Sequence, residues 1–326
     1  MSKGGLTSLE ICAGAGGQAL GLERAGFDPV MLIDNDAHTC ATLRANRPHW
    51  NVCQEDLRPF TGADHSEVLD VDLLSGGVPC SPYSVAGRQH GADDERDLLK
   101  VAIWLASEVS PRAILIENVA ALLTAPKFSA SRTFVREELT HLGYRLHWRV
   151  LHAEQFGVPQ RRPHSVLVAL RPGAFERFRW PEPVGDPPTV GEALHDSMAS
   201  RGWKGTGAWA AAANTIAPTI IGGSKSHGGA DLGPSGAKRA WEKLGINGTS
   251  LANEPPAADF ELRYGVGKHG REGLPRLTVD QVALLQGFHG DWVFSGGKTA
   301  RYRQVAQTLP PSVAEAVGRR IAEALG

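Results

Sequence analysis

The first 170 residues alternate between short apolar runs and segments whose apolar positions have helical spacing. The apolar runs cover 7–12, 29–33, 72–75, 113–116 and 165–170. Their continuous hydrophobicity is typical of parallel strands that are buried on both faces. Helical spacing occurs between them, at 18–25, 37–46, 96–109 and 133–142. This alternation predicts a doubly wound α/β domain.

The pattern changes near Trp180, where glycine, proline, alanine and serine become frequent. The stretch PEPVGDPP predicts a boundary, and glycine-rich loops continue to Gly273, so we expect a second, smaller and irregular domain. Residues 312–325 regain helical spacing and are expected to pack back onto the first domain. The predicted division is 1–179 with 302–326 for the first domain and 180–301 for the second.

Composition fits a soluble globular protein, with 326 residues, 42% hydrophobic and 21% charged. A net charge of -1 means that contacts with a polyanion would depend on local patches. The cysteines Cys12, Cys40, Cys53 and Cys80 show no CxxC spacing, so neither a metal site nor a disulfide framework is expected. No stretch is long and apolar enough for a bilayer and no signal-peptide core is present, so we expect a cytoplasmic protein without membrane association.

The Pro79-Cys80 pair in DLLSGGVPCSPYS provides a candidate nucleophile. A buried strand opens into a loop at Gly76-Gly77, which is where α/β enzymes present catalytic groups. Because only the thiolate attacks well, such a site must also lower the pKa of the thiol. A buried structural cysteine is the alternative interpretation.

Polar residues and glycines end several other predicted strands. The loop Ala13-Gly14-Ala15-Gly16-Gly17 departs from the G-x-G-x-x-G spacing, which favours an adenosine-type ligand over a pyrophosphate. An acidic residue in Asp34-Asn35-Asp36 can accept hydrogen bonds from ribose hydroxyls, although a solvated turn would have the same sequence. Asp56 is placed to accept from an adenine amino group.

Glu117-Asn118-Val119 places a carboxylate where another buried run stops. A glutamate beside an apolar wall can exchange a proton with the edge of a base. A strand-end carboxylate with a purely structural role is the alternative. With Cys80 expected at the same edge of the sheet, Glu117 becomes a candidate partner of the nucleophile.

Six blocks occur in one order that resembles the DNA (cytosine-5) methyltransferases across nearly the whole chain. They are SLEICAGAGG, VPCSPYSVAGRQHGADDERDLL, LIENVAAL, QFGVPQRRPHSVLVAL, RLTVDQVALLQGF and YRQVAQTLPPSVAEAVG. The resemblance implies a Rossmann-like domain that binds S-adenosylmethionine. It also implies a target-recognition domain in the region that begins near Trp180.

The same resemblance implies covalent chemistry on a flipped-out cytosine in a specific sequence of double-stranded DNA. Cys80 would add to carbon 6, Glu117 would hold the ring nitrogen and amine, and Arg162 would steady the base, with His164 nearby. The implied donor site comprises Glu10, Ile11, Cys12, Ala13, Gly14, Gly16, Gly17, Asp34, Asn35, Asp56, Leu57, Pro79, Gln307 and Thr308. A monomer is expected, with a cognate restriction endonuclease that acts separately.

Four residues, at three places in the chain, depart from the pattern of that family. Cys12 stands where many members stack an aromatic ring on adenine, and His164 replaces the second arginine of its block. Because imidazole titrates near neutrality, activity is expected to depend more steeply on pH. Ala306 and Gln307 replace a glycine and an asparagine.

These departures leave several alternatives to simple methyl transfer. Changes near the donor favour a carboxylated S-adenosylmethionine as the second candidate. A catalytically silent DNA-binding relative and an RNA-modifying relative are further alternatives. Local positive charge supports a nucleic-acid contact, with five basic residues against Asp231 and Glu242: Lys204, Lys225, Lys238, Arg239 and Lys243.

Overall fold

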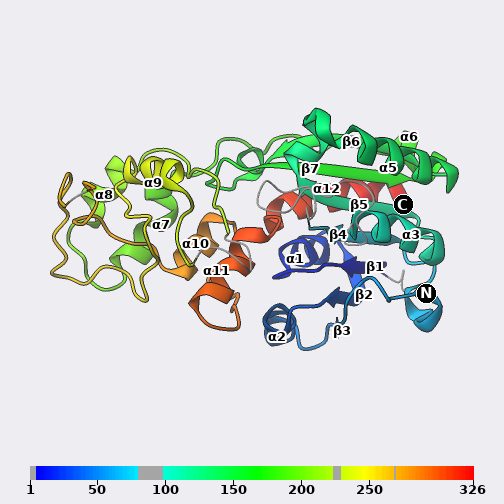
Figure 1. Cartoon of the computed structure of the whole chain (residues 1–326), viewed down its shortest axis with the longest axis horizontal. Helices are drawn as coiled ribbons and strands as arrows, with labels where there is room; N and C mark the ends of the chain where they lie inside the picture. The colour runs from blue at the N-terminus through cyan, green and yellow to red at the C-terminus, as the bar shows by residue number, and fades with distance from the viewer. Residues whose placement is uncertain (1–4, 80–97, 223–228, 268) are drawn as a thin grey trace. The chain divides into compact units, whose positions relative to one another are not determined.

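The computed structural model describes residues 5–79, 98–222, 229–267 and 269–326. The chain divides into two compact units (Figure 1). Unit 1 comprises 1–151, 163–182 and 311–326, and unit 2 comprises 152–162 and 183–310. The sequence placed the boundaries at 180 and 302, and the target-recognition role of the second part stays a prediction.

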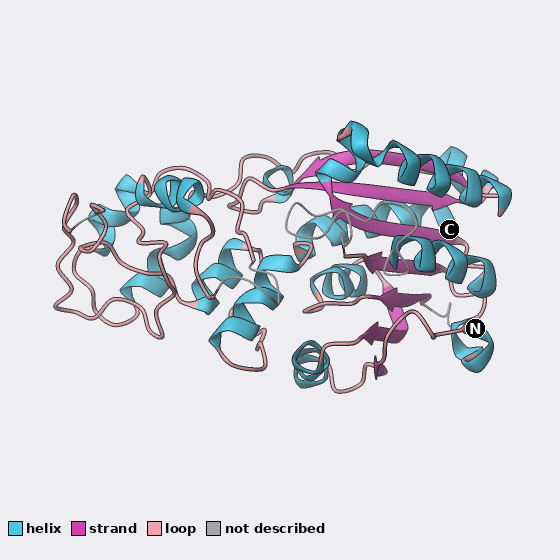
Figure 2. Cartoon of the chain, viewed as in Figure 1, coloured by secondary structure: helices cyan, strands magenta, loops and turns pink. Residues whose placement is uncertain are grey.

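A single seven-stranded sheet, magenta in Figure 2, forms the centre of unit 1 and has the order β3-β2-β1-β4-β5-β7-β6. Neighbouring strands from β3 to β5 are parallel, as predicted. The strands are β1 Leu6–Ile11, β2 Phe27–Asp34, β3 Val52–Gln54, β4 Leu73–Gly77, β5 Ala113–Val119, β6 Arg145–His152 and β7 Pro163–Leu170.

The α-helices of unit 1 follow the predicted alternation. They are α1 Gly17–Arg24, α2 Ala37–Asn46, α3 Leu98–Val109, α4 Ala120–Thr124, α5 Ser129–His141, α6 Pro172–Arg177 and α12 Pro311–Leu325. Asp36 caps α2 by accepting from the backbone N–H groups of His38 and Thr39. Apolar residues of α3 and α5 pack into one buried cluster with those of the central strands, so the sheet carries the main core of this unit.

One predicted strand runs in the opposite direction to the others. The run at 165–170 was expected to be parallel, but β7 pairs with β5 in antiparallel register, with Val119 opposite His164. A parallel connection needs a crossover, usually helical. Between β6 and β7 the chain has only the short 3₁₀ turn Ala153–Phe156, so it reverses direction instead.

The last helix was expected to pack onto the first domain, and it packs directly against α1 (Figure 1). A Cβ atom built on Gly21 would lie 2.3 Å from the carbonyl oxygen of Pro311. A Cβ on Gly318 would lie 2.9 Å from the Cβ of Ala25. These two glycines therefore allow the helix backbones to approach more closely than any other residue would permit.

Unit 2 consists of helices joined by long loops, and none of its described residues between 183 and 310 belongs to the sheet (Figure 2). Its helices are α7 Val190–Ala199, α8 Thr206–Ala212, α9 Ser235–Glu242, α10 Val279–Leu285 and α11 Lys298–Gln307. Thr189 and Thr278 form capping boxes with Glu192 and Gln281, which fixes where α7 and α10 begin.

Candidate active site

Asp34 fixes the glycine loop that follows β1. Its Oδ2 accepts from the backbone N–H of Gly14 at 2.9 Å, and its Oδ1 accepts from that of Asp36 at 2.9 Å. The backbone N–H of Ala13 donates to the carbonyl of Ile33 at 3.0 Å. The carboxylate predicted to bind ribose thus also holds the loop of β1 against the end of β2.

Cys12 lies at the start of this loop in the left-handed region, with φ of 49°. Burial, and then the charges of Asp34 and Asp56, raise the pKa of the Cys12 thiol to about 12. The thiol is therefore neutral at physiological pH. Strands β1, β2 and β3 are parallel, so Cys12, Asp34 and Asp56, at or just after their carboxyl ends, lie along one edge of the sheet.

Glu10 and Ile11 are the last two residues of β1, directly before the loop, and both are buried. Glu10 is 1% exposed, and its Oε2 accepts from the hydroxyl of Ser75 at 3.3 Å. Burial raises the pKa of Glu10 to about 8, against the lowering effect of hydrogen bonds from Ser75 and the backbone of Ala19. Glu10 is therefore largely protonated at neutral pH, in the core next to the loop.

Asp56 is paired with Arg58 through both of its carboxylate oxygens. The hydrogen bonds from the Arg58 side chain and backbone hold the pKa of Asp56 below its usual value. Leu57 is buried next to it. A ligand that used the Asp56 carboxylate would share it with the guanidinium or displace it.

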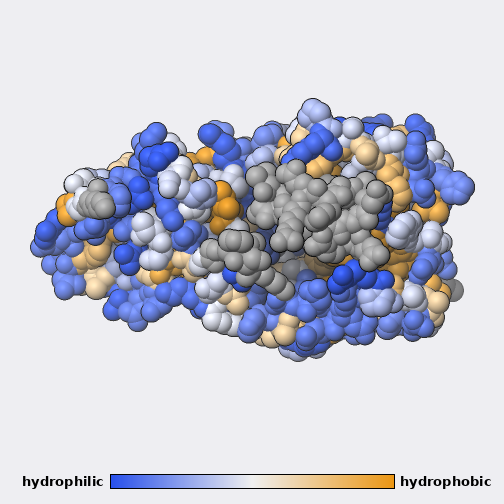
Figure 3. All heavy atoms as spheres, viewed as in Figure 1, coloured by the Kyte–Doolittle hydropathy of each residue, from blue (hydrophilic) through white to orange (hydrophobic). Residues whose placement is uncertain are grey.

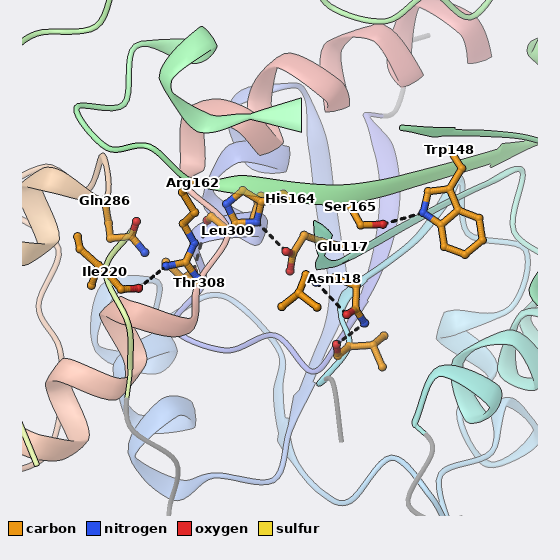
Figure 4. A network of polar contacts seen from close by, with 12 residues as sticks. Glu117, Asn118, Trp148, Arg162, His164, Ser165, Ile220, Gln286, Thr308 and Leu309 are labelled. Carbon is orange, nitrogen blue, oxygen red and sulfur yellow. Dashed lines mark hydrogen bonds and ion pairs between the residues drawn. The ribbon is translucent and has the colours of Figure 1, made fainter. Parts of the chain in front are cut away.

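Glu117 on β5 and His164 on the adjacent strand β7 form a close pair (Figure 4). The Nδ1 atom of His164 lies 2.7 Å from Oε1 of Glu117. His164 is opposite Val119 and Glu117 is opposite Val166, so the two side chains are diagonal neighbours on one face of the β5–β7 pair. Only 3% of the His164 side chain and 13% of the Glu117 side chain are exposed.

The second carboxylate oxygen of Glu117 faces the end of β4. A Cβ atom built on Gly77 would lie 3.5 Å from Oε2 of Glu117. Asn118 donates from Nδ2 to the carbonyl of Val78 at 3.0 Å, which ties the end of β5 to the end of β4. Pro79 follows and is exposed. The candidate nucleophile Cys80 comes next in the chain but lies outside the described residues.

Arg162 belongs to unit 2, where the backbone of Ile220 orients it. Its Nη1 donates to the carbonyl of Ile220 at 2.9 Å (Figure 4). Its backbone N–H donates to Oε2 of Glu154 at 3.2 Å. The backbone N–H of Ile220 in turn donates to Oε1 of Gln160 at 2.7 Å. The fully buried Gln286 bonds to Gln160 and donates to the carbonyl of Val305 at 2.9 Å.

Sequence reasoning missed Gln160 and Gln286. Both glutamines are fully buried, and together they hold the segment that orients Arg162. The available signal was a glutamine within the apolar run LLQGF, because a buried amide needs partners.

The C-terminal candidates also belong to unit 2. Ala306 is 2% exposed, and a Cβ on Gly222 would approach the Cβ of Ala306 to 3.0 Å. Its methyl group, which a glycine would lack, thus packs against a glycine of the same unit. Gln307 is exposed and Thr308 is buried.

The predicted basic residues of unit 2 differ in their surroundings. Lys238 lies 3.1 Å from Oδ2 of Asp231, so a carboxylate already neutralises it. Lys204, Arg239 and Lys243 are exposed, on a unit whose visible face is mostly hydrophilic (Figure 3). Lys225 lies outside the described residues. Within the described part of the chain, no three His, Cys, Asp or Glu side chains are placed to hold a metal ion. No described helix has the length and hydropathy to cross a membrane.

The chain is similar to known proteins over almost its whole length. It is 50% identical over 321 residues to the Type II methyltransferase M.NaeI of Lentzea aerocolonigenes, which covers 98% of this chain and 75% of that protein. It is 46% identical to M.NgoMIV of Neisseria gonorrhoeae, with 98% of both chains covered. Among solved structures, a Spodoptera frugiperda DNMT2 variant has the same fold, with a TM-score of 0.66 at 15% identity over 97% of this chain and 99% of that one.

The family model for C-5 cytosine-specific DNA methylases matches residues 6–323. This match takes in the loop after β1, the Glu117–His164 pair and the whole of unit 2. Since the match spans nearly the entire chain, the protein belongs to the C-5 cytosine-specific DNA methylase family.

Proposed function

We propose that this chain methylates carbon 5 of a flipped-out cytosine in a specific duplex DNA sequence through a covalent adduct with Cys80. The observation that carries the proposal is the placement of Glu117. One oxygen is held by His164, and the other faces Gly77, three residues before Cys80. A base held by Glu117 would therefore lie near the start of the loop that carries the nucleophile.

The chemistry begins with the Cys80 thiolate. Its sulfur forms a bond to carbon 6, and the electrons of the carbon 5–carbon 6 double bond move into the ring. Glu117 gives its proton to ring nitrogen 3, so the adduct is neutral and carbon 5 is nucleophilic. After carbon 5 has taken up the methyl group, its proton leaves to a base and the carbon–sulfur bond breaks. Nitrogen 3 returns its proton to Glu117.

The loop after β1 fits an S-adenosylmethionine donor, which supplies an electrophilic methyl group when bound. Glycines at φ of 54° and 82°, Gly14 and Gly16, keep side chains out of this loop. Each oxygen of Asp34 accepts a backbone N–H, and a carboxylate oxygen has the geometry to accept from a ribose hydroxyl as well. Asp56 would accept a hydrogen bond from the adenine amine in place of its present hydrogen bonds from Arg58.

Arg162 would steady the target base on the side of the thiolate. A guanidinium has five N–H groups, so it can keep its bond to Ile220 and still donate to a base oxygen. The exposed Lys204, Arg239 and Lys243 would contact phosphates, while loops of unit 2 read the sequence.

The relatives suggest a biological setting for this activity. M.NaeI and M.NgoMIV are named as Type II methyltransferases. We infer that this chain, as a monomer, protects sites that a cognate restriction endonuclease cuts separately.

The covalent step can be tested with DNA in which 5-fluorocytosine replaces the target cytosine. The native protein should become trapped on this DNA in the presence of donor, because the proton that must leave carbon 5 is absent. Cys80→Ala should neither be trapped nor methylate ordinary DNA, but it should still bind donor. Cys53→Ala, at a half-buried cysteine of β3, is the matched control and should react normally. Turnover by Cys80→Ala near the native rate would refute the assignment.

The carboxylated donor is tested in competition with S-adenosylmethionine. Mass spectrometry of the nucleosides distinguishes methylcytosine from carboxymethylcytosine in the same reaction. The pair Ala306→Gly, Gln307→Asn should leave this product ratio unchanged if Ala306 serves only to fill the space beside Gly222.

A further inference from the structure

The Glu117–His164 pair differs in chemistry from the pair that an arginine would form at position 164. Arginine is protonated throughout the pH range in which proteins work, whereas histidine ordinarily titrates near neutrality. The pair is 2.7 Å apart and almost fully enclosed, with 3% of the His164 side chain exposed. The charge opposite Glu117 therefore depends on one proton in a site that is shielded from solvent.

We propose that His164 is a positioning residue that orients Glu117 and, as an imidazolium, makes it an effective acid toward the target cytosine. The inference rests on the proposed function, because it assigns Glu117 the protonation of the base. His164 acts through Glu117 and need not touch the base.

Orientation follows from the use of both carboxylate oxygens. When Nδ1 of His164 carries a hydrogen, it donates to Oε1 of Glu117 and fixes the rotation of the carboxyl group. The Oε2 atom then faces Gly77 at the end of β4 and can carry the proton meant for the base. The hydrogen bond from His164 therefore fixes both the position of the Glu117 carboxyl group and the direction in which its Oε2 points.

The charge acts during proton transfer. As sulfur bonds to carbon 6, the proton moves from Oε2 of Glu117 to nitrogen 3, and the carboxyl group becomes a carboxylate. An imidazolium 2.7 Å from Oε1 stabilises this new negative charge, and the shielding strengthens the interaction. His164 keeps its own proton, so the pair returns to its starting state when nitrogen 3 gives its proton back.

Few other charges lie on the elements that pack around the pair. The described residues of β4 carry no titratable side chain, α4 carries none, and Glu117 is the one such group on β5. The edge strand β6 carries Arg145, His147, Arg149 and His152, and Arg162 precedes β7 in the chain. Arginine charges are constant near neutrality, and burial lowers the pKa of His147 below its ordinary value.

The test is the pH dependence of kcat with saturating donor and DNA, from pH 6 to 9.5. The native enzyme should lose activity at the alkaline side as His164 loses its proton. In His164→Arg this loss should move to higher pH or vanish. His164→Gln keeps a hydrogen-bond donor without the charge, so its kcat at pH 7 should fall about 10–100-fold and vary little on the alkaline side. His141→Arg, at an exposed position of α5, should retain the native profile.

Two outcomes would overturn the inference. If the alkaline loss came from Glu117 itself, the permanent cation in His164→Arg would favour the carboxylate and move the loss to lower pH. Native kcat and pH profile in His164→Gln would show that the imidazole charge has no role. If His164→Arg does not fold, as judged by circular dichroism, the glutamine variant decides alone.

Trapping on 5-fluorocytosine DNA separates this inference from the proposed function. A native protein that is not trapped would refute the covalent mechanism as a whole. A native protein that is trapped, but whose pH profile does not respond to His164→Arg, would refute only the role of His164.

Discussion

Glu10 is a carboxyl group that the fold keeps in its acid form. It is 1% exposed in the core beneath the donor loop, and no described residue provides a partner for its Oε1. Burial raises the pKa of Glu10 to about 8. The folded state therefore binds a proton that the unfolded chain releases above its ordinary pKa of about 4.3.

This difference predicts how stability changes with pH. Because the folded-state pKa is raised, the contribution of Glu10 is fully present below the unfolded pKa and is lost as pH rises toward about 8. Glu10→Gln removes the titrating group and should flatten this decline by up to about 1.4 kcal/mol per pH unit. Urea unfolding at pH 5.5, 7 and 8.5 measures it. Equal slopes for native and variant would show that Glu10 ionises normally in the folded protein.

Asp34 is expected to affect both donor binding and the loop that it holds. Asp34→Asn replaces one acceptor with a donor, so either Gly14 or Asp36 loses its partner. Donor affinity should fall by about 1–3 kcal/mol, as measured by calorimetry, while the methylated DNA sequence stays the same. Asp64→Asn, at an exposed position away from this loop, is the control. A changed DNA preference in Asp34→Asn would contradict the assignment of Asp34 to the donor.

At the scale of single residues, sequence reasoning placed Asp34, Asp56 and Glu117 at strand ends because polar residues that follow buried runs have few other positions. It also singled out His164 as a departure, but not its contact with Glu117. That contact depends on the direction of β7, which the apolar pattern of 165–170 does not encode. Cys80, the strongest sequence candidate, lies outside the described residues, so its role stays a prediction.

At the scale of elements, the alternation of apolar runs and helical spacing located most of unit 1. The helix predicted at 37–46 has those bounds in the structure, and the predicted strands agree within a few residues. The edge strand β6 was missed, although Leu146, Trp148 and Val150 alternate with Arg145, His147 and Arg149. Such alternation is the period-two pattern of a half-exposed strand, and it differs from the continuous apolar runs that predicted the other strands.

The close packing of α1 and α12 gives a prediction at the same scale. Gly21→Ala places a Cβ 2.3 Å from a backbone oxygen, so one helix must move. The free energy of unfolding should fall by about 1–3 kcal/mol or more. Gly207→Ala in α8 adds the same methyl group where no atom lies within 4 Å and should be neutral or slightly stabilising. Similar urea midpoints for the two variants would show that the helices separate easily.

At the scale of the whole molecule, the two units predict separable functions. Exchange of residues 183–301, which keeps the donor-site candidates Gln307 and Thr308, for the corresponding part of a family member with another target should change the methylated sequence. Donor affinity should stay within about twofold, because Asp34, Asp56 and the glycine loop belong to unit 1. Sequencing of modified DNA checks the first result and calorimetry the second. A chimera that keeps the original target would refute the recognition role of unit 2.

Unit 1 was harder to delimit from sequence than its elements were. It is assembled from three chain segments, 1–151, 163–182 and 311–326, and local composition marks only the change near Trp180. The excursion at 152–162 is short and ordinary in composition, so its membership in unit 2 follows from contacts between distant residues.

The packing of α12 on α1 also has a consequence for how the protein folds during synthesis. Helix α1 precedes all of unit 2 in the chain, and its partner α12 follows unit 2. A ribosome must therefore release nearly the whole chain before the first helix can be covered, and closing so long a loop slows folding. A prematurely terminated product would leave Gly21 and its neighbours without their partner surface. A chain that ends before α12 is therefore expected to be less stable than one that includes it.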